Sequence, residues 1–558
     1  MSLPSNRSCN TTREPDYILQ GMFRQLSMDL GLWENEEVTR AYGLLTSRKY
    51  LQFLHLTDSW SRQQYATSGE HRRWNQLACL LKKYPFEDPL IDKEAAAWEK
   101  FLAAEHSCKR LNQRFRARRA RLVSPPYELY VHRARRYIRS IIGETPNFDR
   151  IWDMCDFGPG SAVGVHGPRT HSATKLSGKW SVTPAAVPYA IAALSRNAQV
   201  WELVMGSPTC YDFGMFSEKV KGRMSLVDYN KIVFVPKTAK VHRTIAMEPL
   251  LNGFVQKGVD NYLRGKLARV GIDLSDQGRN QNLALSGSCG GFNPFSTIDL
   301  SAASDSISKE LVRELLPPDW FNFLNAIRSP RYESSRGSGR YEKFTSMGNG
   351  FCFPLETLIF ASIVHSVYAV TGDSEFAVYG DDIIVRQSSA LLVLEVLKYV
   401  GFDANLDKTF IFGPFRESCG ADFFEGVNVR PYYVDEIPRK AVDVFKWLNG
   451  ISQKWGYDSC WEFLLGVIHP EWHLFRPHPG PDDSITVPVD RFMSSRYCKW
   501  NRDEQRWSWL RCLTIAVFDK EIFSPPIQMY GLLRGAQSNQ GTMQFTLRRK
   551  TRTRLAYT

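Results

Sequence analysis

The chain has 558 residues, enough for three or four structural units at about 150 residues each. Apolar residues make up 43% of it and aromatic residues 13%, which excludes a disordered chain. Lysine and arginine together number 71 against 58 aspartates and glutamates, so the formal net charge is +13. A basic excess of this size favours a polyanionic partner, with nucleic acid ahead of an anionic membrane surface.

Several other classes of protein are excluded by the arrangement of residues. The longest apolar stretch, at 357–370, has 14 residues, whereas a membrane-spanning helix needs roughly 18–20. The polar N-terminus lacks the apolar segment typical of a signal peptide. The eleven cysteines are scattered and include no C-x-x-C pair, which argues against a zinc ribbon or a disulfide framework. We therefore expect a soluble protein of a reducing cytosol, with no membrane partner.

The first 225 residues predict helices and contain two unusual segments. Short helices are expected at 17–32 and 36–45. The segment 109–139 carries Lys109 and ten arginines against one acid, Glu128. Solvated helix faces usually mix both signs, so this segment predicts a surface for template RNA or a host factor, although a plain solvated face stays an alternative. The loop 156–164 nearly matches G-x-G-x-x-G, but no strand precedes it and no cofactor role is expected.

From residue 231 onward, short strand-like runs alternate with helical stretches. The runs are KIVFVP at 231–236, STIDL at 296–300, VYGDDIIV at 378–385 and FIFG at 410–413. The helices are expected at 307–316, 355–370 and 390–400. This order predicts an α+β core rather than a doubly wound sheet. The residues after 430 read as irregular and end in a basic tail, RRKTRTR, at 548–554.

The run VYGDDIIV predicts a tight hairpin with two adjacent carboxylates at its tip. Two β-prone halves flank the turn-forming centre that contains Asp381 and Asp382. Neighbouring carboxylates raise one another's pKa unless a cation neutralises them. A plain Gly-Asp turn without a functional role is the alternative.

A second acidic site follows the strand-like run STIDL. Asp299 closes this apolar run, and a charge at the end of a buried strand needs a partner or a metal. Asp305 lies at the start of the next helix, where an acid is favourable even without a functional role. If the strand before Asp299 pairs beside the hairpin, three carboxylates converge and suit Mg²⁺ or Mn²⁺. Two such metals about 3.5–4 Å apart would support phosphoryl transfer.

Two further segments have the residues to bind a nucleotide. Lys237, Lys240 and Arg243 recur at every third position, as donors for a triphosphate, although a solvated basic face would look the same. The glycine-rich loop 345–351 offers Ser346 and Asn349 as hydrogen-bonding partners for a sugar hydroxyl. A simple helix-entry loop is the alternative for that segment.

Taken in order, these segments resemble the motifs of a template-dependent nucleic-acid polymerase. The runs VPKTAKVHRTIAMEP, DLSAASDSIS, SMGNGF, YGDD and RESCGADFF are similar to the replicase catalytic subunit of leviviruses, the small positive-strand RNA bacteriophages. The resemblance covers about residues 230–435. It implies an RNA-directed RNA polymerase shaped as a right hand, with an RRM-like antiparallel palm sheet. The implied divisions are an N-terminal region with part of the fingers (1–225), fingers (226–290), palm (291–430) and thumb with basic tail (431–558).

The same resemblance implies roles for single residues. The metal ligands would be Asp299, Asp381 and Asp382, holding two Mg²⁺ ions for which Mn²⁺ can substitute. The nucleotide-binding residues would be Lys237, Lys240, Arg243, Asp305, Ser346 and Asn349, with Asp305 and Asn349 sensing the ribose 2′-hydroxyl. Lys408 would be a candidate general acid for pyrophosphate.

The resemblance also implies partners and a location. The partners would be template RNA, ribonucleoside triphosphates, the host elongation factors Tu and Ts, and a host ribosomal protein, in the cytoplasm of the bacterial host. Two other functions stay open. A reverse transcriptase also carries paired aspartates in its hairpin, and a non-catalytic RNA-binding protein would keep the basic surface.

Overall fold

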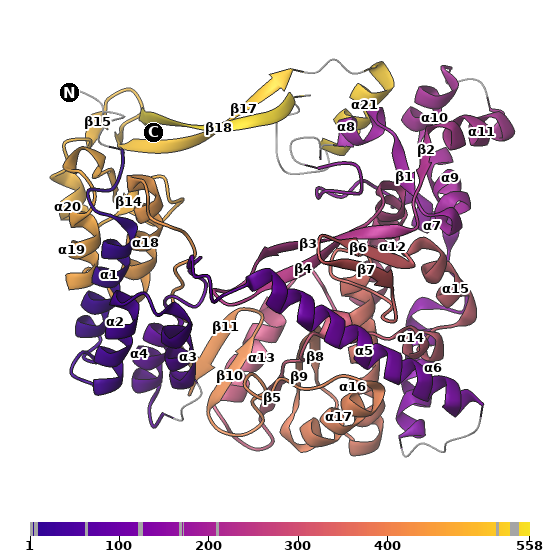
Figure 1. The fold of residues 1–558 in the computed structure, drawn as a ribbon, viewed down its shortest axis with the longest axis horizontal. Coiled ribbons are helices and arrows are strands. Elements are labelled where there is room, and N and C mark those ends of the chain that lie inside the picture. Colours follow the sequence, from indigo (N-terminus) through magenta and orange to yellow (C-terminus); the bar gives the residue numbers. More distant parts are fainter. Residues whose placement is uncertain are drawn as a thin grey trace.

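The computed structural model describes residues 4, 9–61, 65–120, 127–166, 170, 172–207, 211–520, 524–535 and 546–557. Helices surround several small sheets, so the α+β class predicted from the sequence is confirmed. Figure 1 shows two lobes, one at the left and one at the right, with small sheets and helices between them at the bottom.

The first lobe joins the two ends of the chain. Helices α1 (Pro15–Asp29), α2 (Glu36–Thr46), α3 (Tyr50–Trp60) and α4 (Ser68–Cys79) share one hydrophobic core with α18 (Ala441–Trp455), α19 (Ser459–Gly466) and α20 (Val489–Met493). Trp60, Trp447 and Trp461 are fully buried in it. The short strands β13 (Phe475–Arg476) and β14 (Ile485–Thr486) belong to the same lobe. This core therefore combines residues from the first and the last of the divisions expected from the sequence.

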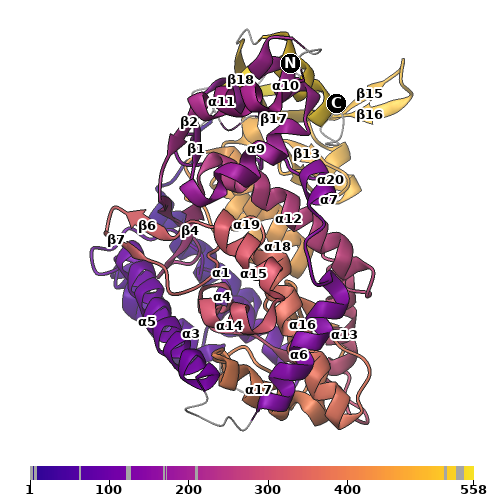
Figure 2. The same ribbon diagram turned by 90° about the vertical axis from the view of Figure 1, so that its right-hand side faces the viewer.

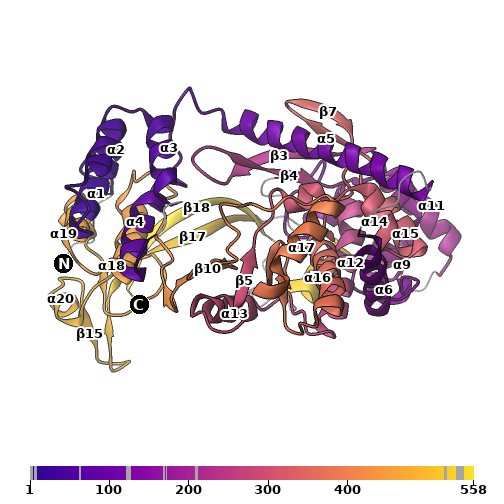
Figure 3. The same cartoon turned by 90° about the horizontal axis from the view of Figure 1, so that it is seen from below.

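The second core is larger and holds the middle of the chain. Its helices are α5 (Lys93–Arg119), α6 (Glu128–Ile142), α7 (Phe148–Asp153), α8 (Ser172–Ser177), α9 (Val187–Ser195), α10 (Ala198–Met205), α11 (Phe213–Arg223), α12 (Leu250–Ala268), α14 (Lys309–Leu315), α15 (Pro318–Ile327), α16 (Cys352–Thr371) and α17 (Gln387–Val400). Strands β1 (Trp180–Val182) and β2 (Met224–Leu226) pair in parallel beside them. Helix α5 extends across the face of this lobe in Figure 1 and along its edge in Figure 3.

Three sheets lie between or beside these cores. Strands β5 (Phe295–Ile298), β9 (Asp382–Arg386) and β8 (Ala377–Tyr379) form an antiparallel sheet in that order. A four-stranded sheet has the order β4 (His242–Met247), β3 (Tyr229–Pro236), β6 (Arg331–Ser334), β7 (Gly337–Arg340). The third consists of β10 (Phe415–Ser418), β11 (Ala421–Phe424) and β12 (Val427–Asn428), and α13 (Gly278–Ser288) packs against it and against β5.

Besides the stretches of chain that pass directly from one core to the other, two β segments link the lobes in the described part of the chain. The tip of the β3–β4 hairpin reaches the first core, where Ala239 is buried and its amide donates to the carbonyl of Lys82 at 2.8 Å. The ribbon of β17 (Leu510–Lys520) and β18 (Thr546–Tyr557) starts in the first core at Leu510 and runs across the top of Figure 1. Helix α21 (Pro525–Gly535) places Tyr530 in the second core. The ribbon therefore ties the two lobes together.

Helix α16 is longer than its apolar stretch suggested. It has 20 residues, and an 18-residue stretch of it has a mean hydropathy of 1.5, so by length and composition alone it could cross a membrane. However, 78% of that stretch is buried inside the protein, and α6, α12 and α17 pack against it. A buried position explains its apolar sequence without a membrane.

Two expectations about secondary structure were wrong. The run FIFG at 410–413 is not a strand but makes a single bridge, from Phe410 to Thr297, because Gly413 has a φ of 76° and Pro414 follows it. The residues after 430 are not irregular, since α18–α20 pack into the first core and β15 (Lys499–Asn501) pairs with β16 (Arg506–Ser508). That hairpin projects from the body in Figure 2.

Candidate active site

The two acidic segments meet at one end of the sheet β5–β9–β8. Ile298, the last residue of β5, pairs with Ile383 of β9 in antiparallel register. Extending this register by one residue sets Asp299 opposite Asp382. Tyr379 pairs with Asp382 across the hairpin, so Gly380 and Asp381 form its turn. The structure thus brings Asp299, Asp381 and Asp382 to the same end of two adjacent strands.

The hairpin turn is fitted closely against the start of α16. Gly380 has a φ of 60°, and its amide donates to Oγ1 of Thr357 at 3.0 Å. A Cβ atom at this position would lie 2.4 Å from the ring of Phe353 and 3.1 Å from Oε1 of Glu356. Only glycine satisfies both the backbone conformation and the space. Helix α16 therefore fixes the position of the hairpin turn, and with it the positions of Asp381 and Asp382.

Asp299 is held by residues from the segment that follows α17. Its carboxylate accepts a hydrogen bond from Nδ2 of Asn405 at 2.8 Å, and its amide donates to Oγ1 of Thr409 at 3.3 Å. Burial raises the pKa of Asp299 to about 6, Lys408 and Asn405 oppose this rise, and Asp381 adds to it. A carboxylate in such surroundings would ionise more readily if a cation were bound beside it.

Asp382 is oriented by the turn between β10 and β11. Its Oδ1 accepts from Oγ of Ser418 at 3.2 Å and from the amide of Cys419 at 3.1 Å. Burial raises the pKa of Asp382, the bond from Cys419 lowers it, and Asp381 raises it further. The pattern matches that of Asp299, in which burial and a like charge both disfavour ionisation.

The three carboxylates fit hard cations by the chemistry of their oxygen atoms. Each of them stands at a strand end, and none forms an ion pair with a Lys or Arg of the described residues, although Lys408 lies near enough to Asp299 to influence its pKa. Within the described part of the chain, no three His, Cys, Asp or Glu side chains are close enough to form a ready-made metal site. Their oxygen atoms are donors that suit a divalent cation, which would need further oxygen ligands from outside the chain.

Glu356 is a residue of this site that the sequence did not reveal. It lies in the first turns of α16 and is 3% exposed. Its Oε2 accepts a hydrogen bond from Oγ of Ser304 at 2.5 Å. Burial raises the pKa of Glu356 to about 8, and the charges of Asp381 and Asp305 raise it as well. It joins the segment after β5 to the hairpin turn, and no local sequence pattern could have indicated this.

The three cations of the β3–β4 hairpin do not share one environment. Partial burial, Arg243, Lys100 and Lys408 lower the pKa of Lys237, while Asp381 acts in the opposite direction, so Lys237 senses the acidic site. Arg243 is exposed on β4, opposite Val235. Lys240 instead forms an ion pair with Asp58 of α3. The structure brings Lys237 and Arg243 to one region and sets Lys240 against the first lobe.

The two residues expected to sense a sugar differ in exposure. Asp305 lies in a short 3₁₀ helix, η4 (Ala303–Ser306), and its Oδ1 accepts from Nζ of Lys343 at 2.7 Å. Asn349 is buried, and its Oδ1 accepts from the amide of Phe351 at 3.2 Å. Ser346 is also buried. The described side-chain bond of Asn349 lies within the loop, whereas the side chain of Ser346 contacts that of Tyr341.

The loop carrying Ser346 and Asn349 is seated against two other elements. Gly348 has a φ of 108°, and a Cβ there would lie 2.2 Å from the carbonyl oxygen of Ala246 on β4. The amide of Gly350 donates to Oε1 of Gln256 on α12 at 3.0 Å. Glycine at these positions allows the loop to pack closely against β4 and α12.

Lys408 lies near the acidic site and is half-exposed. Its Nζ is 3.3 Å from Oε1 of Glu417. Partial burial alone would lower the pKa of Lys408, but the carboxylates of Glu417 and Asp299 outweigh burial and raise it. The side chain is therefore a protonated group within the influence of a candidate metal ligand.

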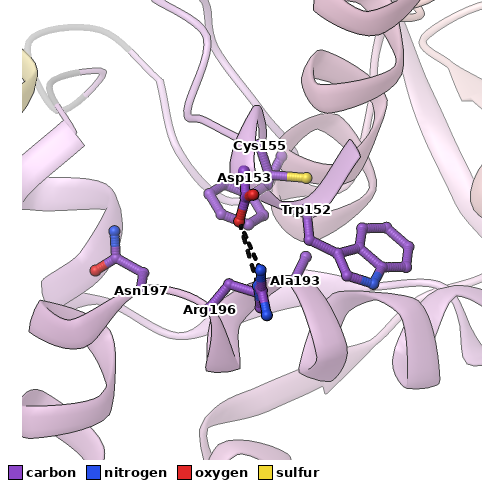
Figure 4. A pocket seen from close by; sticks show the side chains of 7 residues that line it. Trp152, Asp153, Cys155, Ala193, Arg196 and Asn197 are labelled. Atoms are coloured by element: carbon purple, nitrogen blue, oxygen red, sulfur yellow. Dashed lines mark hydrogen bonds and ion pairs between the residues drawn. The ribbon is translucent and has the colours of Figure 1, made fainter. Parts of the chain in front are cut away.

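Two pockets in the described part of the chain lie away from these residues. One, of about 110 Å³, is lined in part by Arg196 and Asp153, which form an ion pair at 3.2 Å (Figure 4). The other, of about 290 Å³, borders β8, and there Arg279 donates to the carbonyls of Gly271 and Phe376. In both, the charged groups satisfy each other or the backbone, so neither competes with the carboxylate site as a candidate.

Comparison with known proteins gives a consistent set of relatives. The family described as "RNA replicase, beta-chain" matches residues 68–472. The RNA-directed RNA polymerase subunit beta of Escherichia virus Qbeta is 39% identical over 410 residues, which are 71% of this chain and 65% of that protein. The corresponding subunit of Enterobacteria phage SP is 41% identical over 424 residues, 73% of this chain and 70% of that protein. The chain thus spans about two thirds of the length of these two relatives.

Solved structures show a weaker likeness. A chain from a structure described as an "RdRp complex" covers 81% of this chain and 44% of its own length, with 10% identity and a TM-score of 0.37. The RNA-dependent RNA polymerase of BmCPV at the elongation state covers 61% of this chain and 33% of its own, with 11% identity and a TM-score of 0.33. Likeness at this level does not establish a shared fold.

Proposed function

The chain belongs to the RNA replicase beta-chain family, and we propose that it is an RNA-directed RNA polymerase that copies the genome of a positive-strand RNA bacteriophage. The observation that carries this proposal is the antiparallel pairing of β5 with β9, which gathers Asp299, Asp381 and Asp382 at one strand end. Ribonucleoside triphosphates would be the substrates and pyrophosphate the second product. Carboxylates collected in this way suit metal-assisted nucleotidyl transfer.

In the proposed reaction, the 3′-hydroxyl of the growing RNA attacks the α-phosphate of the incoming nucleotide. Asp299, Asp381 and Asp382 would hold two Mg²⁺ ions, or Mn²⁺ in their place, which supply charge neutralisation at the attacking and leaving oxygens when bound. Lys237 and Arg243 would neutralise the triphosphate, and Lys240 would join them only if its ion pair with Asp58 opened. Lys408 would donate a proton to the departing pyrophosphate.

Sugar recognition would belong to the segments that flank the carboxylates. Asp305 would accept a hydrogen bond from the ribose 2′-hydroxyl, because its side chain is partly exposed beside the site. Ser346 and Asn349 would contribute after the loop 345–351 moves to expose their polar atoms, since both are buried by their neighbours. Template RNA would be bound mainly through its backbone, with base pairing supplying sequence choice.

The proposed function implies a right-hand architecture and an assembly. The sheet β5–β9–β8 would be the centre of an RRM-like palm within 291–430, with fingers in 226–290 and part of 1–225, and the thumb in 431–558. By likeness to relatives named as beta subunits, the chain would work with other subunits. The candidates are elongation factors Tu and Ts and a ribosomal protein, in the cytoplasm of the bacterial host.

The test uses full-length protein, an RNA template and Mg²⁺, with either ribonucleotides or deoxyribonucleotides, and with or without the candidate host factors. Template-dependent incorporation of ribonucleotides that stops with a chelator is the expected result. A preference for deoxyribonucleotides would favour a reverse transcriptase. Binding of RNA without incorporation, even with the host factors added, would favour a non-catalytic RNA-binding protein.

A further inference from the structure

A fully buried lysine lies behind the segment that follows β5. Lys343, in the loop after β7, has no exposed side-chain surface. Its Nζ is 2.7 Å from Oδ1 of Asp305, 3.9 Å from Oε1 of Glu105, and 3.8 Å from the centroid of the Phe101 ring. Removing an ammonium group from water is unfavourable unless the group is well paired. Among the described residues, the only carboxylate in hydrogen-bonding distance is that of Asp305.

The backbone and the neighbours of Lys343 leave it little freedom. Lys343 forms a bridge with Ser308, and Oε2 of Glu105 accepts from the amide of Glu342 at 2.6 Å. Both contacts hold the loop against α5 and the start of α14. The backbone of Lys343 is therefore fixed, and its ammonium group can hold Asp305 in one position, as a positioning residue must.

Asp305 is held on one side only. Its amide donates to the carbonyl of Ala302 at 3.0 Å, which completes the turn of η4, and Oδ1 is occupied by Lys343. Among the described residues, none donates a hydrogen bond to Oδ2. The side chain is 21% exposed. One carboxylate oxygen is thus fixed by Lys343, and no donor among the described residues occupies the other.

We propose that Lys343 is a positioning residue for sugar selection, which holds the carboxylate of Asp305 so that its free oxygen accepts the 2′-hydroxyl of an incoming ribonucleotide. This inference rests on the proposed polymerase function. An ionised acceptor forms a stronger hydrogen bond to a hydroxyl than a neutral one does. A site built around such a bond rejects the analogue that lacks the hydroxyl, because a buried polar group is then left without its partner.

The test compares kcat/KM for a ribonucleotide and its deoxyribonucleotide, using the full-length chain on an RNA template with Mg²⁺. Lys343→Met should lower the preference for the ribonucleotide by roughly tenfold or more, mostly through the ribonucleotide, because the loss of a charge-assisted hydrogen bond is expected. Lys343→Arg should restore part of the preference. Lys175 offers a matched control, since it is also buried but donates to the carbonyls of Gly158 and Gly160. Lys175→Met should leave the preference unchanged.

A double-variant cycle separates this inference from the function on which it rests. If Lys343 acts through Asp305, then Lys343→Met adds no further loss of preference in an Asp305→Asn background. This double variant removes both charges, so it also serves if Lys343→Met alone fails to fold. An effect of Asp305→Asn without an effect of Lys343→Met would overturn the inference and leave the polymerase standing. If Asp305→Asn kept the wild-type preference for ribonucleotides, the inference would fail, because Asp305 would not select the sugar. If the wild-type protein incorporated no nucleotide, the proposed function itself would fail.

Discussion

The acidic strand ends and the basic segment 109–139 use their charges in opposite ways. At the strand ends, Asp299, Asp381 and Asp382 form no ion pair with a lysine or arginine of the described residues, so their charge is available to a ligand. In the basic segment, Arg116 and Arg119 pair with Glu310, and Arg118 pairs with Glu128 and Glu314. Much of the charge that dominates the sequence is therefore neutralised within the fold.

The comparison shows that the net charge of a segment indicates a binding partner only when charges paired within the fold are left out of the count. Glu310 has 2% of its side chain exposed, and three arginines lie within 4 Å of it. Such pairs fasten α5 to α14 rather than present a surface. On α6, by contrast, Arg135 and Arg136 are exposed and form no ion pair with a described residue. We expect the part of this segment that binds RNA to be α6.

Among the variants of the basic segment, the largest expected effect tests the structural half of the comparison. Arg119→Ala should lower the free energy of unfolding by about 2–3 kcal/mol, because it leaves the buried carboxylate of Glu310 with weaker compensation. Arg135→Ala on the exposed face of α6 is the control and should change stability by no more than about 0.5 kcal/mol. Denaturant unfolding measures both. Equal losses for the two variants would remove the distinction between paired and exposed arginines.

Lys408 tests whether a cation at the acidic site assists the reaction. Lys408→Met should lower the rate of incorporation by roughly 30-fold, about 2 kcal/mol, through loss of a general acid near the leaving group. Lys398, in the last turn of α17, provides a control lysine that should tolerate the same change. Single-turnover kinetics measure the effect. If Lys408→Met kept the wild-type rate of incorporation, the role of Lys408 would be limited to its ion pair with Glu417.

Glu356 predicts a pH dependence of stability in metal-free buffer. Its pKa is raised from 4.5 in the unfolded chain to about 8 in the fold, by burial first and then by Asp381 and Asp305. The folded chain thus binds the extra proton, so its stability falls as the pH rises from 4.5 through about 8. Glu356→Gln should flatten this decline by on the order of 2 kcal/mol between about pH 5 and pH 8. If the free energy of unfolding changed with pH in the same way in the variant and the wild type, Glu356 would not be a buried neutral group.

The smallest expected effect concerns the exposed arginines of α6. Neutralising Arg135 and Arg136 should reduce the slope of log Kd against log salt by about one unit for each RNA phosphate that these side chains neutralise in the wild type. Arg119→Ala, in which a paired arginine is removed, should leave that slope unchanged. Filter binding across a salt series measures it. An unchanged slope in the Arg135 and Arg136 variant would show that RNA does not contact α6.

Local patterns predicted the elements of the site better than their surroundings. The helix expected at 355–370 extends over Cys352–Thr371, and the hairpin with Asp381 in its turn forms as expected, because both depend on neighbouring residues. The sequence could not predict that the strand before Asp299 pairs with this hairpin, and it only indicated what would follow if the two paired. This pairing depends on strands that are far apart in the chain, and because β5 and the centre of β9 are continuously buried, no alternation in either strand marks the register.

The residues that the sequence missed act through distant partners. Glu356 lies 52 positions from Ser304, and Lys343 lies 38 positions from Asp305. Arg116 pairs with Glu310 across 194 positions, which is why the basic segment looked unpaired. Lys240 was expected beside Lys237, but the ion pair with Asp58 follows from the docking of the β3–β4 tip on the first lobe. Contacts of this kind depend on tertiary packing, and the period of the sequence does not encode them.

The most direct test of the central claim compares incorporation and RNA binding in one preparation of Asp381→Asn. We expect incorporation of ribonucleotides to fall by on the order of 10³-fold, because a carboxylate that would hold metal is neutralised while the turn keeps its shape. The affinity for template RNA should stay within about twofold of the wild type, since the residues that we expect to contact its backbone, Arg135 and Arg136, lie on α6. Incorporation at the wild-type rate would contradict the claim that the carboxylates at the ends of β5 and β9 form the active site.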